Sequence, residues 1–152
     1  MRRILVDTNV WLRRAEHDHA MHEAAARSVA RLLQNGAMLC IIPQTLYEFW
    51  AVTTRPATSR SGLGWTPQQC EIEVEKLLSV FHLMLDTSNI YHEWRRLVTT
   101  YNVSGMSSHD ARLVAAMRVH NIEEILTFNF KDFIRYTPEN IRVLDPSHVA
   151  AT

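Results

Sequence analysis

Four acidic residues stand where they could share one reaction centre: Asp7, Glu48, Asp110 and Asp132. Clustered carboxylates repel one another, so they need a positive ion to hold them together. Their hard oxygen atoms suit Mg²⁺ or Mn²⁺ rather than zinc. Such an ion can lower the pKa of a bound water and stabilise the charge that develops at phosphorus. The four acids together therefore indicate a metal site at which a bound water could attack phosphorus.

Asp7 directly follows the apolar run Ile4, Leu5 and Val6. A continuous apolar run is typical of a buried strand in a parallel sheet. In open α/β sheets, ligands bind at the carboxyl ends of the strands, which is where Asp7 would stand. An Asp followed by a hydroxyl and an amide can also simply make a turn or cap a helix. Taken alone, this stretch favours the structural interpretation.

The three later acids change that balance. Glu48 lies among apolar residues in the helix expected after the second strand, and an unpaired buried carboxylate there would be costly. Asp110 lies in the first turn of a helix, where a carboxylate is electrostatically favoured. Asp132 follows the fourth expected strand. Each acid alone is more often structural than catalytic. Four acids placed at one edge of the sheet are much harder to explain by structural roles alone.

The elements that would position these acids alternate along the chain. Apolar runs predict strands at 2–7, 37–42, 83–85, 124–128 and 141–144. Helical spacing and capping residues predict helices at 9–15, 19–34, 43–54, 66–81, 88–101 and 107–120. Segment 55–65 is expected to be an exposed loop, and 129–136 a loop with a short helical turn. This alternation predicts a single α/β domain over residues 1–152 with a parallel sheet.

Composition narrows the class of protein. The chain has 152 residues, of which 47% are hydrophobic, so extensive disorder is not expected. Sixteen basic and sixteen acidic residues give zero net charge, which argues against a simple basic coat for nucleic acid. The two cysteines form no CxxC pair, which fits a reducing cytoplasm. No signal peptide or membrane-spanning run is recognised in the sequence.

Four ordered motifs resemble those of the PIN domain. They are VDTN at 6–9, the glutamate after the second strand, SHDA at 108–111 and LTFNFKDF at 126–133. The resemblance runs from about Arg3 to Leu144. Within this family, the chain is most similar to the VapC-type toxins of toxin–antitoxin pairs. It implies a three-layer α/β/α fold with a parallel sheet of four to five strands. It also implies a ribonuclease that depends on Mg²⁺ or Mn²⁺.

The resemblance also assigns residues. The acids that match its catalytic positions are Asp7, Glu48, Asp110 and Asp132, and the expected metal ligands among them are Asp7 and Asp110. The polar residues expected to support them are Thr8, Asn9 and Asn129. The sequence leaves open whether Asn129 or Asp132 completes the site, and whether one or two ions act.

Partners follow from the same resemblance. It implies an RNA substrate, a homodimer and an antitoxin whose tail covers the acidic pocket. The apolar residues proposed to contact that tail, which could equally pack in the core, are Trp11, Leu12, Phe49 and Trp50. The arginines considered as RNA contacts are Arg13, Arg14, Arg55 and Arg60. Trp65 could stack on a base, although a packing role is favoured for it.

Other classes fit less well. A phosphatase of the HAD type needs a second Asp two residues after the first, where this chain has Asn9. A receiver domain needs an early acidic pair, which is missing. The main alternative is a PIN-like module that binds RNA or protein without cleaving, and the presence of all the core acids argues against it. The RNA target, whether transfer, ribosomal or messenger RNA, is not specified by the sequence.

Overall fold

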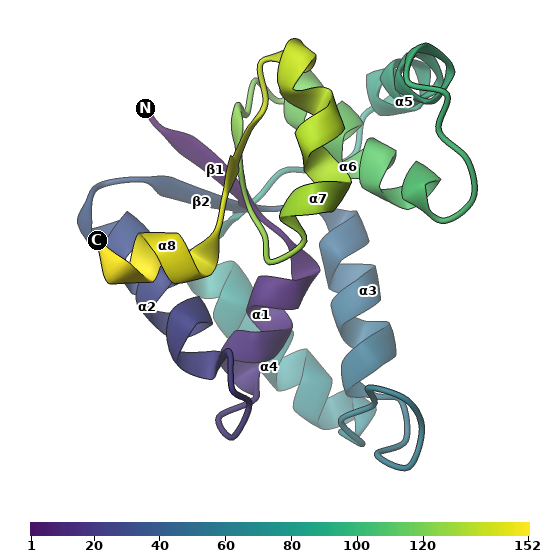
Figure 1. Ribbon diagram of the computed structural model, residues 1–152. Helices are drawn as coiled ribbons and strands as arrows, with labels where there is room; N and C mark the ends of the chain where they lie inside the picture. The colour runs from purple at the N-terminus through teal and green to yellow at the C-terminus, as the bar shows by residue number, and fades with distance from the viewer.

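The computed structural model describes all residues from Met1 to Thr152 and contains one parallel sheet of five strands (Figure 1). The strands are β1 Arg3–Val6, β2 Met38–Ile41, β3 His82–Leu83, β4 Glu124–Leu126 and β5 Arg142–Leu144. Their order across the sheet is β3-β2-β1-β4-β5, and every neighbouring pair is parallel. The first strand of the chain therefore lies at the centre of the sheet.

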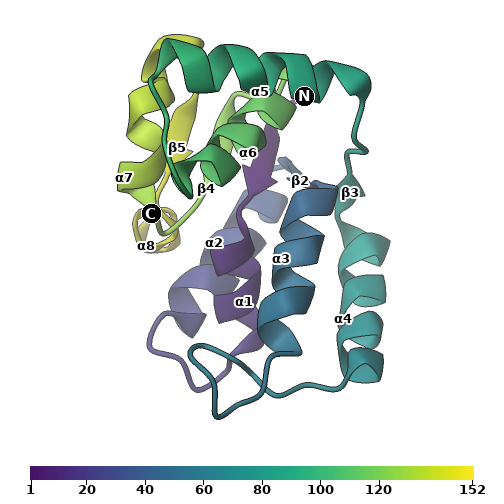
Figure 2. The same cartoon turned by 90° about the vertical axis from the view of Figure 1, so that its right-hand side faces the viewer.

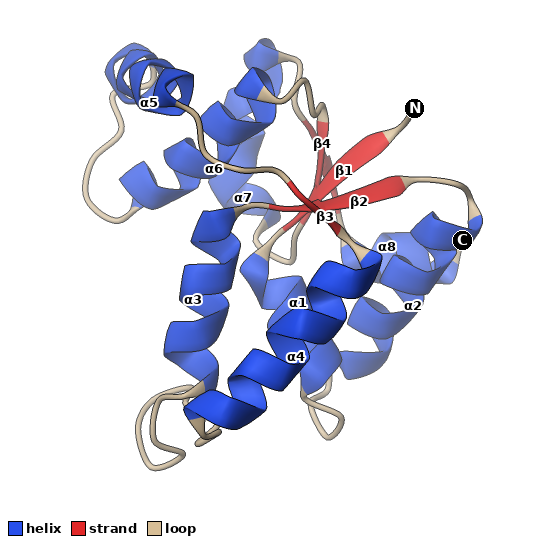
Figure 3. Cartoon of the chain, turned by 180° about the vertical axis from the view of Figure 1, so that it is seen from behind, coloured by secondary structure: helices blue, strands red, loops and turns tan.

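Helices cover both faces of this sheet. They are α1 Thr8–Ala15, α2 His22–Gln34, α3 Pro43–Thr53, α4 Pro67–Val80, α5 Ser88–Thr100, α6 Ser107–Val119, α7 Phe130–Phe133 and α8 Pro146–Ala151, with a 3₁₀ helix η1 Ile134–Glu139. One core joins the sheet to α1, α2 and α4, and a second core joins the other face to α5 and α6. Figures 2 and 3 show these two groups of helices on opposite sides of the strands. The predicted three-layer α/β/α fold is confirmed.

Strand β1 explains why the sequence specifies this centre. Ile4 and Val6 enter the core that contains α1 and α2, and Leu5 enters the core that contains α6. All three side chains have no exposed surface. Burying each contributes about 1.5–3 kcal/mol, so the strand is held from both faces. The residue after it, Asp7, is consequently fixed at the edge of the sheet.

The second helix and the third strand differ most from their predicted bounds. The second helix begins at His22 rather than residue 19, because His19 takes part in turns and its Nδ1 accepts a hydrogen bond from the Met21 backbone. The third strand comprises only His82–Leu83 instead of 83–85, and it pairs with β2 alone at the edge of the sheet. Neither change moves an acid of the predicted site.

Helix α8 was not predicted from the sequence. Its start signals are present: Asp145 caps the helix by accepting a hydrogen bond from the Ser147 backbone, and Pro146 occupies the first turn. The helix packs against α2 (Figure 1). By contrast, the predicted start of α4 is confirmed, because Thr66 and Gln69 form a reciprocal capping box. None of the helices has the length and apolarity needed to cross a bilayer.

Candidate active site

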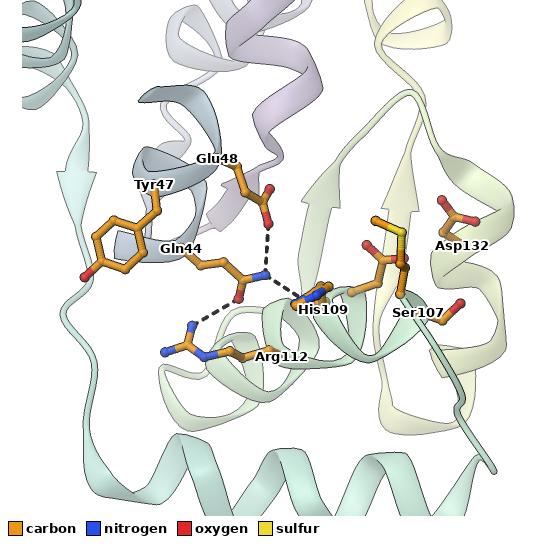
Figure 4. A pocket seen from close by; sticks show the side chains of 9 residues that line it. Gln44, Tyr47, Glu48, Ser107, His109, Arg112 and Asp132 are labelled. Carbon is orange, nitrogen blue, oxygen red and sulfur yellow. Dashed lines mark hydrogen bonds between the residues drawn. The ribbon is translucent and has the colours of Figure 1, made fainter. Parts of the chain in front are cut away.

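A cavity of about 850 Å³ opens at the start of helices α3 and α6, and we call it the acid cavity (Figure 4). Its lining residues are Gln44, Tyr47, Glu48, Met106, Ser107, His109, Asp110, Arg112 and Asp132. Three of the four predicted acids therefore line one cavity. The fourth acid, Asp7, is only 6% exposed. It lies close enough to Glu48 and Asp110 for their charges to raise its pKa. The structure thus brings all four acids together from four separate segments.

Asp7 is held by hydrogen bonds to both of its carboxylate oxygens. Its Oδ1 accepts a bond of 2.7 Å from the Thr8 backbone, which also caps helix α1. Its Oδ2 accepts bonds from the Thr127 hydroxyl at 2.8 Å and from the Asn9 amide at 3.3 Å. Burial nevertheless raises the pKa of Asp7 to about 6, because the loss of water outweighs these donors. The carboxyl group is therefore rigidly placed and poorly solvated.

The polar residues around Asp7 connect the segment after β1 with the segment after β4. The Asn9 amide donates to the Thr127 hydroxyl at 3.2 Å, and its carbonyl oxygen accepts a bond from the Phe128 backbone. The Thr127 hydroxyl also accepts a bond from the Asn129 backbone at 3.0 Å. Asn129 thus enters this network through its main chain, while its side chain is not among those that line the acid cavity.

Glu48 is oriented from both sides. Its Oε2 accepts a hydrogen bond of 2.8 Å from the Thr8 hydroxyl, and its Oε1 accepts one of 3.1 Å from the Gln44 amide. The same Gln44 nitrogen donates to the His109 carbonyl at 2.9 Å, and the Gln44 carbonyl oxygen accepts a bond from Arg112 at 3.0 Å. Figure 4 shows the Gln44 amide between Arg112 and Glu48. One buried amide therefore links α3 to the first turns of α6.

Asp110 and Asp132 are the other two acids of the site. Burial is the main cause that raises the pKa of Asp110 to about 6, and the charges of Asp132 and Glu48 raise it further. Asp132, on the short helix α7, is exposed and reaches the acid cavity from the side opposite Gln44 (Figure 4). The charges of the neighbouring acids therefore make Asp110 harder to ionise.

The donor set fits a hydrated divalent cation. None of the four acids forms an ion pair with Lys, Arg or His, so their charges are not compensated by the protein. No three His, Cys, Asp or Glu side chains are arranged to enclose an ion by themselves. Mg²⁺ keeps several of its waters and is commonly held by one or two carboxylates, so a closed cage of side chains is not required.

The arginines named as possible RNA contacts do not line the acid cavity. Arg13 pairs with Glu16 at 2.6 Å, and Arg14 lies over the Trp11 ring, 6.0 Å from its centre. Arg55 donates to a backbone carbonyl within its own loop. The cation that does line the cavity is Arg112, which sequence reasoning missed.

Burial also corrects the predicted antitoxin contacts. Trp11, Leu12 and Phe49 are 2%, 7% and 1% exposed, so they belong to the core and offer no surface to a peptide. Trp50 is half-buried and packs against the same core. Trp65 packs edge-on against Phe49 with ring centres 6.0 Å apart, consistent with the packing role favoured for it.

Gln44 and Thr127 were missed together with Arg112. One signal was available for Gln44, because it lies four residues before Glu48 and so shares its helix face. Thr127 lay inside the quoted LTFN motif, yet its contact with Asp7 spans 120 residues. Arg112 comes two residues after Asp110, a spacing that does not place two side chains on one helix face.

Residues 4–137 match the model of the PIN domain family. The chain belongs to the PIN domain family. No curated protein matches the sequence. The PIN domain match covers every acid in the acid cavity and the Thr127 contact with Asp7.

Solved structures share this PIN domain fold. A chain in the structure of VapBC2 from Rickettsia felis bound to a promoter DNA fragment is 14% identical, with a TM-score of 0.69, covering 94% of this chain and 98% of that one. A chain of VapBC-1 from nontypeable Haemophilus influenzae is 18% identical, with a TM-score of 0.67 and coverages of 95% and 98%. VapC20 from Mycobacterium tuberculosis, a toxin described as cleaving the sarcin–ricin loop, is 20% identical, with a TM-score of 0.59 and coverages of 80% and 86%.

Proposed function

We propose that this PIN domain is a ribonuclease that uses Mg²⁺ or Mn²⁺ to hydrolyse RNA phosphodiester bonds. The observation that carries the proposal is the convergence of Asp7, Glu48, Asp110 and Asp132 without a cationic partner from the protein. A divalent ion bound there would activate water and stabilise the negative charge that develops during phosphodiester cleavage. Of the four acids, Asp7 and Asp110 are the proposed metal ligands.

The surrounding residues have separate tasks in this proposal. Thr127 and the Thr8 backbone hold the Asp7 carboxylate, and Thr8 and Gln44 hold that of Glu48. These bonds fix the acids before a substrate arrives, so little reorganisation accompanies the reaction. Asp132 is exposed and lines the cavity, where it can contact the ion or the substrate.

Cleavage of labelled RNA in the presence of Mg²⁺ or Mn²⁺ tests this function. We expect the wild type to cleave, EDTA to stop cleavage, and Asp7→Asn to remove activity while the far-ultraviolet circular dichroism is unchanged. Asp145→Asn is a matched control, because this exposed Asp only caps helix α8. Full activity of a folded Asp7→Asn protein would contradict the mechanism. RNA binding without any metal-dependent cleavage would favour the non-catalytic PIN-like module.

The structural neighbours extend the proposal to a biological setting. Several of them are VapBC toxin–antitoxin complexes, which supports a toxin with a cognate antitoxin as its partner. We further propose a homodimer that acts in the cytoplasm, where the two buried free cysteines stay reduced. Sedimentation of the isolated protein tests the dimer. Co-expression with the product of an adjacent short reading frame tests the antitoxin through restored growth and a stable complex.

A further inference from the structure

A second, smaller cavity of about 290 Å³ adjoins the acid cavity, and we call it the aromatic cavity. Its lining residues are Thr87, Ile90, Tyr91, Trp94 and Arg112. Arg112 lines both cavities, so the two share one wall. The Trp94 indole donates a hydrogen bond of 2.8 Å to the Ser108 carbonyl, which fixes α5 to the first turn of α6. That turn also carries Asp110, so the aromatic cavity is rigidly placed relative to the acids.

Arg112 has a charge that the acids of the site do not neutralise. The Gln44 amide lies between its guanidinium and Glu48 (Figure 4). Its ion-pair partner is Asp86 at 3.0 Å, and the two side chains are 33% and 37% exposed. An ion pair that is accessible to water is weak, so a phosphate can compete for the guanidinium. Arginine binds phosphate oxygens through two parallel hydrogen bonds, which makes it suited to that exchange.

The aromatic side chains offer a stacking surface next to this cation. Tyr91 is 55% exposed, and its ring centre lies 6.1 Å from that of Trp94. The buried Ile90 adds an apolar contact. The guanidinium of Arg95 lies 5.9 Å from the Tyr91 ring centre and forms no ion pair, so a second positive charge borders the cavity. Aromatic rings beside arginines are the surfaces on which proteins stack unpaired bases.

We propose that the aromatic cavity is a subsite for one unpaired base of the RNA, next to the phosphodiester in the acid cavity. The base stacks on Tyr91, and Arg112 contacts the phosphate between the two cavities. The inference rests on the proposed ribonuclease function, because the acid cavity sets where the scissile bond lies.

A nucleotide fits this surface better than a second copy of the chain. None of the residues that line the cavity is acidic, whereas Arg112 lies in its wall and Arg95 at its border, and arginine binds phosphate oxygens through paired hydrogen bonds. Its shared wall with the acid cavity also places a cation where a continuous RNA strand would carry its next phosphate. A nucleotide supplies both the flat apolar base and the anionic phosphate that these side chains can bind.

Binding of short labelled RNAs tests the subsite without requiring cleavage. Asp7→Asn protein is titrated with fluorescein-labelled oligoadenylate and with the matched abasic ribose–phosphate oligomer, and binding is followed by fluorescence anisotropy in Mg²⁺. We expect Tyr91→Ala to weaken oligoadenylate binding about 10-fold and to leave the abasic oligomer unaffected. Arg112→Gln should weaken binding of both oligomers by similar factors, because it removes the phosphate contact.

Ile72→Ala is the matched control, since Ile72 on α4 is also 55% exposed and lies outside both cavities. It should leave both affinities unchanged. The subsite is excluded if Tyr91→Ala leaves oligoadenylate affinity intact, or if the protein binds neither oligomer. A change from dimer to monomer in Tyr91→Ala without a change in affinity would assign the cavity to a subunit contact instead. The separate cleavage assay decides the proposed function independently of these results.

Discussion

The Thr127 hydroxyl donates a hydrogen bond of 2.8 Å to the Asp7 carboxylate, although 120 residues separate them in the chain. The two residues follow the neighbouring strands β4 and β1, whose parallel pairing brings their carboxyl ends together. Thr127 has no exposed surface, so its hydroxyl has no water to replace that bond. The contact therefore ties the placement of the first acid to the correct docking of β4.

Thr127→Val should disturb the site more than its small change in shape suggests. It removes the donor to Asp7 and the acceptor for Asn9 and Asn129. We expect a loss of about 1–3 kcal/mol in the free energy of unfolding, because buried partners lose their bonds. We also expect about 10–100-fold slower RNA cleavage, which is typical when a residue that orients a metal ligand is changed. Urea denaturation and steady-state kinetics measure the two effects.

Thr53→Val provides the control for that substitution. Thr53 is also fully buried, but its hydroxyl donates to the Phe49 carbonyl one turn earlier in α3. It should lower stability modestly and leave cleavage unchanged. Equal kinetic loss in both variants would show that Thr127 acts only through general stability.

Stability of the metal-free protein should depend on pH through the buried acids. Burial, followed by the charges of Glu48 and Asp110, raises the pKa of Asp7 from 3.8 to about 6. The folded state therefore binds this proton more tightly than the unfolded state, and stability falls as the pH rises from about 4 to 6. For Asp7 the change corresponds to roughly 3 kcal/mol. Denaturation at pH 5 and pH 7 in EDTA should show the more stable protein at pH 5.

Asp7→Asn should flatten this pH dependence, since an amide does not titrate in that range. Asp110 has a pKa of about 6 for similar reasons, so a smaller dependence remains in the variant. If the free energy of unfolding changed equally with pH in the wild type and the variant, ionisation of Asp7 would not be the cause of the lower stability at pH 7.

Divalent ions should stabilise the folded protein. An ion that binds only the folded state adds about 2.7 kcal/mol at a concentration 100 times its dissociation constant. We expect Mn²⁺ or Mg²⁺ to raise the melting temperature at pH 7, and to raise it less at pH 5, where Asp7 and Asp110 hold protons. Differential scanning calorimetry measures the shift. Ca²⁺ and Na⁺ at equal ionic strength separate specific binding from screening.

Gln44→Met tests whether the amide between Arg112 and Glu48 positions the acid. Met preserves the length of the side chain but loses the bonds to Glu48, Arg112 and the His109 carbonyl. We expect kcat to fall about 10–100-fold, because Glu48 loses a bond that orients it. Gln44→Asn should show a similar loss of kcat, since its shorter side chain cannot reach both Glu48 and Arg112. A normal kcat in Gln44→Met would show that Gln44 does not position Glu48 for catalysis.

Much of the fold was predictable because its signals are local. Ile4, Leu5 and Val6 form a continuous apolar run, and only a central parallel strand buries such a run on both faces. The start of α4 at Thr66 was readable from its capping residue and the proline that follows. The length of β3 was not readable, because an edge strand depends on one neighbour rather than on its own sequence.

The candidate site was also predictable only in part. Its four acids could be named from their places after strands and at helix starts. Thr127 bonds to Asp7 across strands that are distant in the chain, and no spacing in the sequence encodes that contact. The four-residue spacing of Gln44 and Glu48 was readable, but the bond from Gln44 to the His109 carbonyl was not. Arg112 was hidden for the same reason, since its position at the wall of two cavities depends on how α5 and α6 pack.

The central position of β1 between β2 and β4 has a consequence for the cell that makes this protein. While residues 1–105 are being synthesised, the nascent chain carries Asp7 and Glu48 but lacks Asp110, Asp132 and the Thr127 clamp. The four acids of the proposed nuclease therefore cannot come together before residues 107–133 have been synthesised. Any cleavage by this chain is therefore expected only after β4 has paired with β1 and has brought Thr127 to Asp7.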